Sequence, residues 1–363
     1  MAHFSSVEKV VVILRILVLI GVLLAVVAGV CLPVMSLAAE AEIAPLAVDS
    51  LLLDGQVAGE RIVVVGERGH VLVSDDAGHN WAQRPVPTRA TLTSVFFVND
   101  RLGWAAGHDA VILRTSDGGE SWQQVYEDQA GERPILDVWF RDENFGCAVG
   151  AYGLFLTTTD GGTTWQDQLF EAEDLTPAAS VDAGNDDWYE GEEDWGKDVH
   201  LNQIRQAATG RLYIAGEAGN VYRSDDGGAT WLSLAPPYEG SLFGSLALPG
   251  ESLLVYGLRG NLLFSPDAGL HWAAEASGVV ATLNDAIRLR DGRIVLAGLA
   301  GTLLVSRDNG RTLTAYPQAD RAGLSRVLEI GDGALLLIGT HGVRRFQLPA
   351  PLALPPVQRE DDA

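Results

Sequence analysis

The sequence predicts an all-β fold, a seven-bladed β-propeller with six repeated Asp-containing turns, after an N-terminal signal or anchor segment. Three observations predict it. A motif of Ser or Thr, Asp, Gly and usually an aromatic residue recurs six times, and a glycine that ends an apolar run recurs seven times. No helical hydrophobic period of useful length appears after residue 40. Repeats of about 40 residues that each read as four short strands are typical of propeller blades.

The first 38 residues have the composition of a signal peptide or of a membrane anchor. Lys9 and Arg15 precede an apolar run over residues 16–30, and small residues around Ala38 would permit cleavage. The apolar segment over residues 10–35 is also long enough for an uncleaved anchor. We therefore expect an exported, periplasmic or lumenal protein, either soluble after cleavage or anchored to the inner membrane.

The repeated motif, known as an Asp-box, sets the spacing of the blades; one copy is RTSDGGESW at residues 114–122. Its hydroxyl and carboxylate groups can accept hydrogen bonds from backbone amides, and its Gly permits a positive φ. Six copies around a ring cannot converge on one substrate, so we interpret them as structural turns rather than catalytic sites. The six box aspartates, spaced 41, 43, 66, 41 and 41 residues apart, are Asp76, Asp117, Asp160, Asp226, Asp267 and Asp308.

The recurring glycine extends the count from six units to seven. It occurs at Gly66, Gly107, Gly150, Gly216, Gly257, Gly298 and Gly339, and only the last copy lacks a box. We expect the propeller over residues 39–348, followed by a disordered Pro-rich tail over residues 349–363. Because the last unit runs out of chain after three strands, the residues just before Val48 are expected to supply its outer strand.

Propeller topology predicts which face can bind a partner. Strands alternate in direction, so the turns between second and third strands, and the links between blades, lie on the face opposite the Asp-boxes. We expect partner-binding residues in these turns: Glu67, Arg68, His108, Asp109, Tyr152, Glu217, Arg259 and His341. The first strands are expected to line the channel. The residues predicted at the aligned positions are Ser50, Ser94, Asp137, Gln203, Ser245, Asp285 and Arg326. Arg326 is also a candidate for partner binding. The alternative for each single residue is a solvated turn, or a channel side chain bonded to backbone or water.

One insertion, residues 171–198, separates the third and fourth units. It carries eleven acidic residues and one lysine, a composition typical of a solvated, disordered loop. Its aromatic residues favour a second interpretation, a lid that binds a partner, because Trp and Tyr often anchor interfaces. The candidate contact residues in it are Trp188, Tyr189 and Trp195.

Charge and motif content argue against several kinds of ligand. The formal net charge is −23, with 48 acidic and 25 basic residues, whereas nucleic-acid binding needs a basic face that neutralises phosphates. No calcium-binding loop motif and no metal-like spacing of histidines is present. The sequence therefore predicts no nucleic-acid partner, no metal and no small-molecule cofactor.

Two units, GWAAGHDAVILRTSDGGESW and CAVGAYGLFLTTTDGGTTW, resemble the photosystem II stability and assembly factor family. These are lumenal propellers of plants and cyanobacteria with bacterial relatives outside photosynthesis. The resemblance covers roughly residues 46–348. It implies a non-enzymatic scaffold that binds and assists assembly or stability of a membrane protein complex, so the implied partner is a membrane protein or complex.

Two other functions stay open, a sialidase-like glycosidase and a carbohydrate-binding lectin, because Asp-boxes also occur in sialidases. A sialidase needs three arginines on the substrate carboxylate, a Tyr nucleophile with a Glu base, and an Asp acid. Arg68, Arg259 and Arg326 are expected on one face, but no Tyr–Glu pair or F-R-I-P segment accompanies them. The residues therefore favour a non-enzymatic scaffold.

Overall fold

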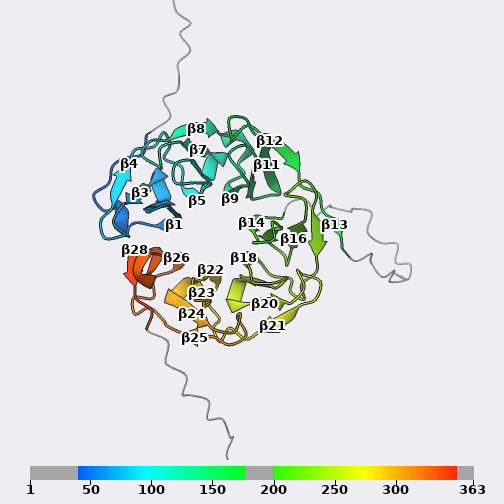
Figure 1. Ribbon diagram of the computed structural model, residues 1–363. Helices are drawn as coiled ribbons and strands as arrows, with labels where there is room; N and C mark the ends of the chain where they lie inside the picture. Colours follow the sequence, from blue (N-terminus) through cyan, green and yellow to red (C-terminus); the bar gives the residue numbers. More distant parts are fainter. Residues whose placement is uncertain (1–39, 176–198, 350–363) are drawn as a thin grey trace, which may run out of the picture. The chain divides into compact units, whose positions relative to one another are not determined.

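The computed structural model describes residues 40–175 and 199–349. In this part of the chain seven sheets surround a central channel, each with its first strand innermost (Figure 1). The prediction of an all-β, seven-bladed propeller is therefore confirmed. The helical segments among the described residues are seven 3-10 turns of three residues each. No described helix is long and apolar enough to cross a membrane.

The strands of each blade follow one another outward from the channel in chain order. Blade A contains β1 (Leu52–Ala58), β2 (Arg61–Gly66), β3 (Val71–Ser74) and β4 (Ala82–Arg84), and blade B contains β5 (Leu92–Phe97), β6 (Gly103–Gly107), β7 (Ile112–Thr115) and β8 (Gln123–Tyr126). Blade C contains β9 (Ile135–Phe140), β10 (Gly146–Gly150), β11 (Leu154–Thr158) and β12 (Gln166–Leu169). Blade D contains β14 (Leu201–Gln206), β15 (Leu212–Gly216), β16 (Val221–Ser224) and β17 (Leu232–Leu234), with β13 (Glu173–Asp174) as an added fifth strand.

The last three blades repeat this plan. Blade E contains β18 (Leu242–Ala247), β19 (Leu253–Gly257), β20 (Leu262–Ser265) and β21 (Ala273–Glu275), and blade F contains β22 (Leu283–Arg288), β23 (Ile294–Gly298), β24 (Thr302–Ser306) and β25 (Thr314–Ala315). Blade G contains β26 (Leu324–Glu329), β27 (Leu335–Gly339) and β28 (Gly342–Phe346). The 3-10 turns are η1 (Ala47–Asp49), η2 (Glu67–Gly69), η3 (His108–Ala110), η4 (Gln129–Gly131), η5 (Leu258–Gly260), η6 (Leu299–Gly301) and η7 (Gly331–Gly333).

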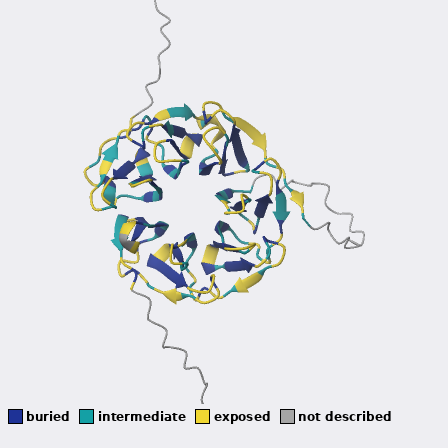
Figure 2. Cartoon of the chain, in the orientation of Figure 1, coloured by how far each residue is buried: buried dark blue, intermediate teal, exposed yellow. Residues whose placement is uncertain are grey.

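The second strands are apolar throughout because neighbouring blades cover both of their faces. Every residue of β6, β10, β15, β19, β23 and β27 is buried, and in β2 only Arg61 is partly exposed. The outermost strands are the most exposed, as β12 shows (Figure 2). An uninterrupted apolar run followed by glycine therefore marks the middle of each blade.

Seven hydrophobic clusters hold the ring together, one between each pair of adjacent blades. The cluster that joins the two ends of the chain packs Leu52 and Val64 of blade A against Leu336 and Ile338 of blade G. Ring closure therefore depends on side-chain packing of the same kind as the other six contacts.

The prediction that the residues just before Val48 supply the outer strand of blade G is wrong. Among the described residues, β28 pairs only with β27. The N-terminal segment instead lies along blade A, where the Ala41 amide donates to the Val86 carbonyl and the Gln83 side-chain oxygen accepts from the Ala44 amide. Pro45 has no amide hydrogen, so it cannot donate a hydrogen bond to a neighbouring strand. Next to it, residues 47–49 form η1, which contacts β28 without pairing to it.

Candidate functional site

Seven equivalent hydrogen bonds define the face where the sequence places the candidate site. In every blade, the residue that follows the recurring glycine donates its amide to the carbonyl of the residue just before the first strand. Two examples are His108 to Thr91 at 2.9 Å and Leu258 to Ser241 at 3.0 Å. The second-to-third turns and the inter-blade links therefore lie on one face, which we call the mouth face. The Asp-box turns lie on the opposite face, the box face.

The candidate residues in these turns lie on the mouth face as expected. Arg68, Asp109, Tyr152 and Arg259 have left-handed backbone, with φ of 56°, 58°, 53° and 57°. A non-glycine residue in this region costs energy and is held there by its surroundings. After Arg68 and Arg259 the following glycine packs against the link, and all four left-handed residues are exposed.

The structure brings together only some of the candidate residues. The Tyr152 ring meets the His200 ring edge-on, with centroids 4.9 Å apart. His200 also lies 3.8 Å from the carboxylate of Glu217. Tyr152, His200 and Glu217 therefore form one cluster across blades C and D. Sequence reasoning missed His200, because it precedes β14 in a link whose path the motif spacing does not predict.

The other turn residues lie apart from one another. Arg68 and Glu67 belong to blade A, His108 and Asp109 to blade B, Arg259 to blade E and His341 to blade G. His341 lies 3.9 Å from the Asp320 carboxylate. Trp188, Tyr189 and Trp195 of the insertion lie outside the described residues.

The channel is lined by one residue from the first strand of each blade, next to a β-bulge that occurs in all seven. The prediction of Ser50 and Ser245 for this ring was wrong. The residues that share the register are Asp54, Ser94, Asp137, Gln203, Gly244, Asp285 and Arg326. Because each bulge adds one unpaired residue, strand alternation counted along the sequence does not locate the ring.

These ring residues join adjacent blades. The Asp54 carboxylate accepts from the Val95 amide at 2.8 Å, and the Asp285 carboxylate accepts from the Val327 amide at 2.9 Å. Asp137 and Gln203 accept equivalent bonds from the next blade. In each case the donor is the residue after the ring position of the following blade. The acceptor side chains of the ring therefore bind one blade to the next inside the channel.

Arg326 closes the ring with ion pairs. Its guanidinium lies 3.1 Å from the Asp54 carboxylate of blade A and 3.0 Å from the Asp285 carboxylate of blade F. Burial alone would lower the pKa of Arg326, but Asp285 and Asp54 raise it above its ordinary value. Burial raises the pKa of Asp137, although Arg205 beside it acts in the opposite direction. Arg326 therefore lies inside the channel, away from Arg68 and Arg259 in the mouth-face turns, and the three arginines do not converge as a sialidase site requires.

The bulge residues form the mouth of this channel around a cavity of about 260 Å³. Four of them are polar and bond to backbone carbonyls of the following blade: Thr93, Asn202, Asn284 and Ser325. Three are apolar and also line the cavity: Leu53, Leu136 and Phe243. The channel offers little free polar functionality, because most of its polar side chains already bond to protein groups.

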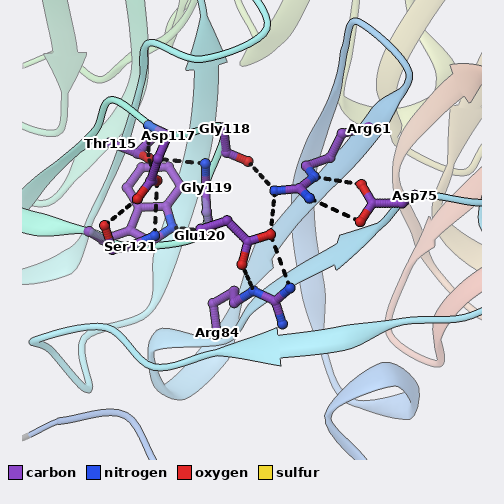
Figure 3. Close-up of polar contacts among 10 residues, drawn as sticks. Arg61, Asp75, Arg84, Thr115, Asp117, Gly118, Gly119, Glu120 and Ser121 are labelled. Carbon is purple, nitrogen blue, oxygen red and sulfur yellow. Dashed lines mark hydrogen bonds and ion pairs between the residues drawn. The ribbon is translucent and has the colours of Figure 1, made fainter.

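The box face repeats one geometry at all six boxes. In blade B the Thr115 hydroxyl accepts from the Gly119 amide at 3.0 Å, and the Asp117 carboxylate accepts from the Ser121 amide at 3.0 Å (Figure 3). Equivalent bonds are made by Asp76, Asp160, Asp226, Asp267 and Asp308. The box carboxylates are thus engaged within their own turns.

Ion pairs next to the box join blades A and B (Figure 3). Arg61 donates two hydrogen bonds to Asp75 at 2.6 and 2.9 Å and lies 2.7 Å from Glu120. Arg84 lies 2.7 Å from the other oxygen of Glu120. No group of three or more potential metal ligands occurs in the described residues. The box face is therefore occupied by structural contacts.

The fold and the six boxes define an Asp-box propeller of seven blades. Residues 35–131 match the family model described as photosynthesis system II assembly factor YCF48, which confirms the resemblance to the photosystem II assembly factor family. No curated protein matches the chain.

Solved structures share the fold. "YCF48 bound to D1 peptide" is 18% identical, with a TM-score of 0.65 over 84% of this chain and 95% of the other. "YCF48 from Cyanidioschyzon merolae" is 19% identical, with a TM-score of 0.62 over 85% of this chain and 98% of the other. A streptogramin B lyase is 10% identical, with a TM-score of 0.64 over 86% and 97% of the two chains. Because proteins of different activity share it, the fold alone does not specify function.

Proposed function

We propose that this chain is an exported, non-enzymatic scaffold that binds a segment of a membrane protein and assists assembly or stability of a membrane protein complex. The match to the assembly-factor family model supports the proposal that the chain is an assembly factor. The structure titled "YCF48 bound to D1 peptide" is that of a similar propeller with a bound peptide.

The observation that carries the proposal is the contrast between the two faces. The box face repeats the same hydrogen bonds in six blades, whereas the mouth-face turns present different exposed side chains in each blade. A surface whose residues vary without disturbing the sheets can specialise in recognition. We therefore place the partner on the mouth face, with the cluster of Tyr152, His200 and Glu217 as its best-defined element.

The test is quantitative capture of partners from detergent-solubilised membranes with the protein as bait. Replacing Tyr152, Arg259 and His341 together by Ala should leave the circular dichroism spectrum unchanged and reduce capture. The matched control replaces three exposed box-face residues, Glu60, Asp100 and Leu270, by Ala and should retain capture. Full capture by the mouth-face variant would place the partner elsewhere on the propeller.

The insertion requires a narrower deletion than its full length. Residues 173–174 form β13 against β17, and Phe170 and Ala172 pack in the core between blades C and D. Removing residues 171–198 would disturb that core. Residues 175 and 199 lie at opposite edges of blade D, next to β13 and β14, so replacing residues 176–198 by a Gly-Ser linker of about 10 residues leaves the core in place. If the acidic insertion helps to hold the partner, this replacement should weaken capture while the melting temperature stays the same.

A further inference from the structure

Three exposed apolar residues lie on the mouth face of blades E and F, in two turns and in the link between the blades. Leu258 belongs to η5, Val280 to the link between the blades, and Leu299 to η6. Val280 is 89% exposed and Leu299 46%. Leaving such side chains in water is unfavourable, and clustered exposed apolar residues mark sites of contact. We call these three residues the apolar rim.

Backbone contacts hold the three segments of the apolar rim next to one another. A Cβ placed on Gly260 of η5 would meet the Val279 carbonyl, so that turn lies directly against the link. At the other end of the link, the Leu299 amide donates to the Thr282 carbonyl at 2.9 Å. The three side chains therefore come from tips that are held side by side on the ring.

Two arginines border the apolar rim without acidic partners. Arg259 follows Leu258 directly, and Arg321 lies beside η6, where its Cα would be 2.9 Å from a Cβ on Gly301. Both are exposed, and neither makes an ion pair with a described carboxylate. On a chain of net charge −23, this part of the mouth face is locally apolar and basic.

We propose that the apolar rim docks on the surface of a lipid bilayer. Leu258, Val280 and Leu299 would enter the boundary between headgroups and acyl chains, and the guanidinium groups of Arg259 and Arg321 would contact lipid phosphates. The rim consists of projecting tips rather than a groove, and Tyr238, whose hydroxyl donates to the Leu258 carbonyl at 3.3 Å, adds a ring of the kind enriched at membrane interfaces. A bilayer is therefore a better fit than a folded protein.

The place where the described residues begin also favours a lipid bilayer as the occupant. The described part begins at Glu40, whose carbonyl accepts from the Arg89 side chain in the link between blades A and B. That link lies on the mouth face, and the residues before Glu40 in the sequence contain the long apolar segment. The proposal does not depend on a protein partner, so it can fail or succeed separately from the proposed function.

The test measures the depth of single labelled positions in the full chain, bound to vesicles of phosphatidylcholine and phosphatidylglycerol. A fluorophore is attached at Val280→Cys, at Leu299→Cys, or at the control Leu270→Cys, which is 52% exposed on the box face of blade E. Cys31 is replaced by Ser. Cys147 can remain, because it is buried and burial raises the pKa of its thiol to about 12.

We expect nitroxide-labelled lipids to quench the fluorophore at positions 280 and 299 but not at position 270. Replacing Leu258 and Val280 by Asp should abolish quenching at position 299, whereas Leu270→Asp should leave it unchanged. Equal quenching at all three positions, or quenching at position 299 that survives the double replacement, would overturn the proposal. Quenching that requires added membrane protein would also overturn it and point to a protein occupant.

Discussion

At the scale of single residues, the Asp-box is explained by hydrogen bonds that end within its own turn. The carboxylate of Asp117 accepts from the Ser121 amide and also from the Ser121 hydroxyl, and it bonds to Thr115 at the start of the box. The indole of Trp122 donates to the Gly119 carbonyl at 3.1 Å. These hydrogen bonds show that the carboxylate stabilises its own turn. The recurrence of the Asp-box therefore does not indicate catalysis.

Asp117→Ala should therefore reduce stability without affecting partner capture. Loss of several hydrogen bonds in a turn should lower the free energy of unfolding by about 1 to 3 kcal/mol. Urea unfolding measures this, with Asp100→Ala, an exposed carboxylate on the same face, as the control. An unchanged unfolding midpoint together with lost capture would show that Asp117 contacts the partner.

The boxes should also make the protein sensitive to acid. Hydrogen bonds from the Asn80 amide and side chain lower the pKa of Asp76 from 3.8 to about 2. Burial would raise the pKa of Asp117, but hydrogen bonds from Ser121 outweigh it and lower the value to about 2. Because the folded state has the lower pKa, these groups contribute stability above about pH 4 that is lost as pH falls toward about 2.

The difference in melting temperature between the wild type and Asp117→Ala isolates one box. We expect this difference to be constant near neutral pH and to shrink between about pH 4 and about pH 2 as the carboxylate is protonated. Thermal melts at a series of pH values give the measurement. A difference that is the same at both ends of the acid range would contradict the proposed role of the charge.

At the scale of the blade, the recurring glycine marks where a turn meets the link of its own blade. The residue after Gly107 donates its amide to the Thr91 carbonyl, and the same carbonyl lies where a Cβ on Gly107 would be. The φ of Gly107 is −179°, which any residue can adopt. Close approach, rather than backbone conformation, therefore requires glycine at this position.

Gly107→Ala should push the turn away from the link and break the bond from His108. Inserting a methyl group into such a contact should lower the free energy of unfolding by about 3 kcal/mol. The control is Gly331→Ala, because no described atom lies within 4 Å of a Cβ at that position. Equal stability of the two variants in urea would show that the blade relaxes around the methyl group.

At the scale of the whole molecule, blade G completes the ring without an outer strand from the N-terminal segment. Hydrophobic packing between blades A and G, the bond from the Ser325 hydroxyl to the Leu52 carbonyl at 3.1 Å, and the ion pairs of Arg326 act together there. Residues 273 positions apart in the sequence are thus joined at the channel.

Arg326→Met should weaken this closure, because it leaves the carboxylates of Asp54 and Asp285 without their cation. Removing one partner of a buried ion pair costs about 3 to 5 kcal/mol. Adding Asp285→Asn should recover part of the loss, since an amide oxygen can still accept from the Val327 amide. Urea unfolding of the single and double variants decides; a double variant less stable than Arg326→Met would show that Asp285 stabilises the ring by another route.

The sequence alone determined the number of blades and the position of the boxes, because both depend on local patterns that each unit repeats. The Asp-box bonds span four residues, and the glycine contact lies within one unit, so their spacing is visible along the chain. Those patterns also indicated that the candidate turns share one face.

Only the tertiary structure decided the channel ring, the path of the N-terminal segment and the cluster around His200. A bulge shifts the register of every first strand, which is why Asp54 and Gly244 replace the predicted Ser50 and Ser245. The other two features depend on contacts between residues distant in the sequence, such as Ala44 with Gln83, 39 positions apart, and Tyr152 with His200. Such contacts are selected by packing of whole blades, and no local pattern in the chain encodes them.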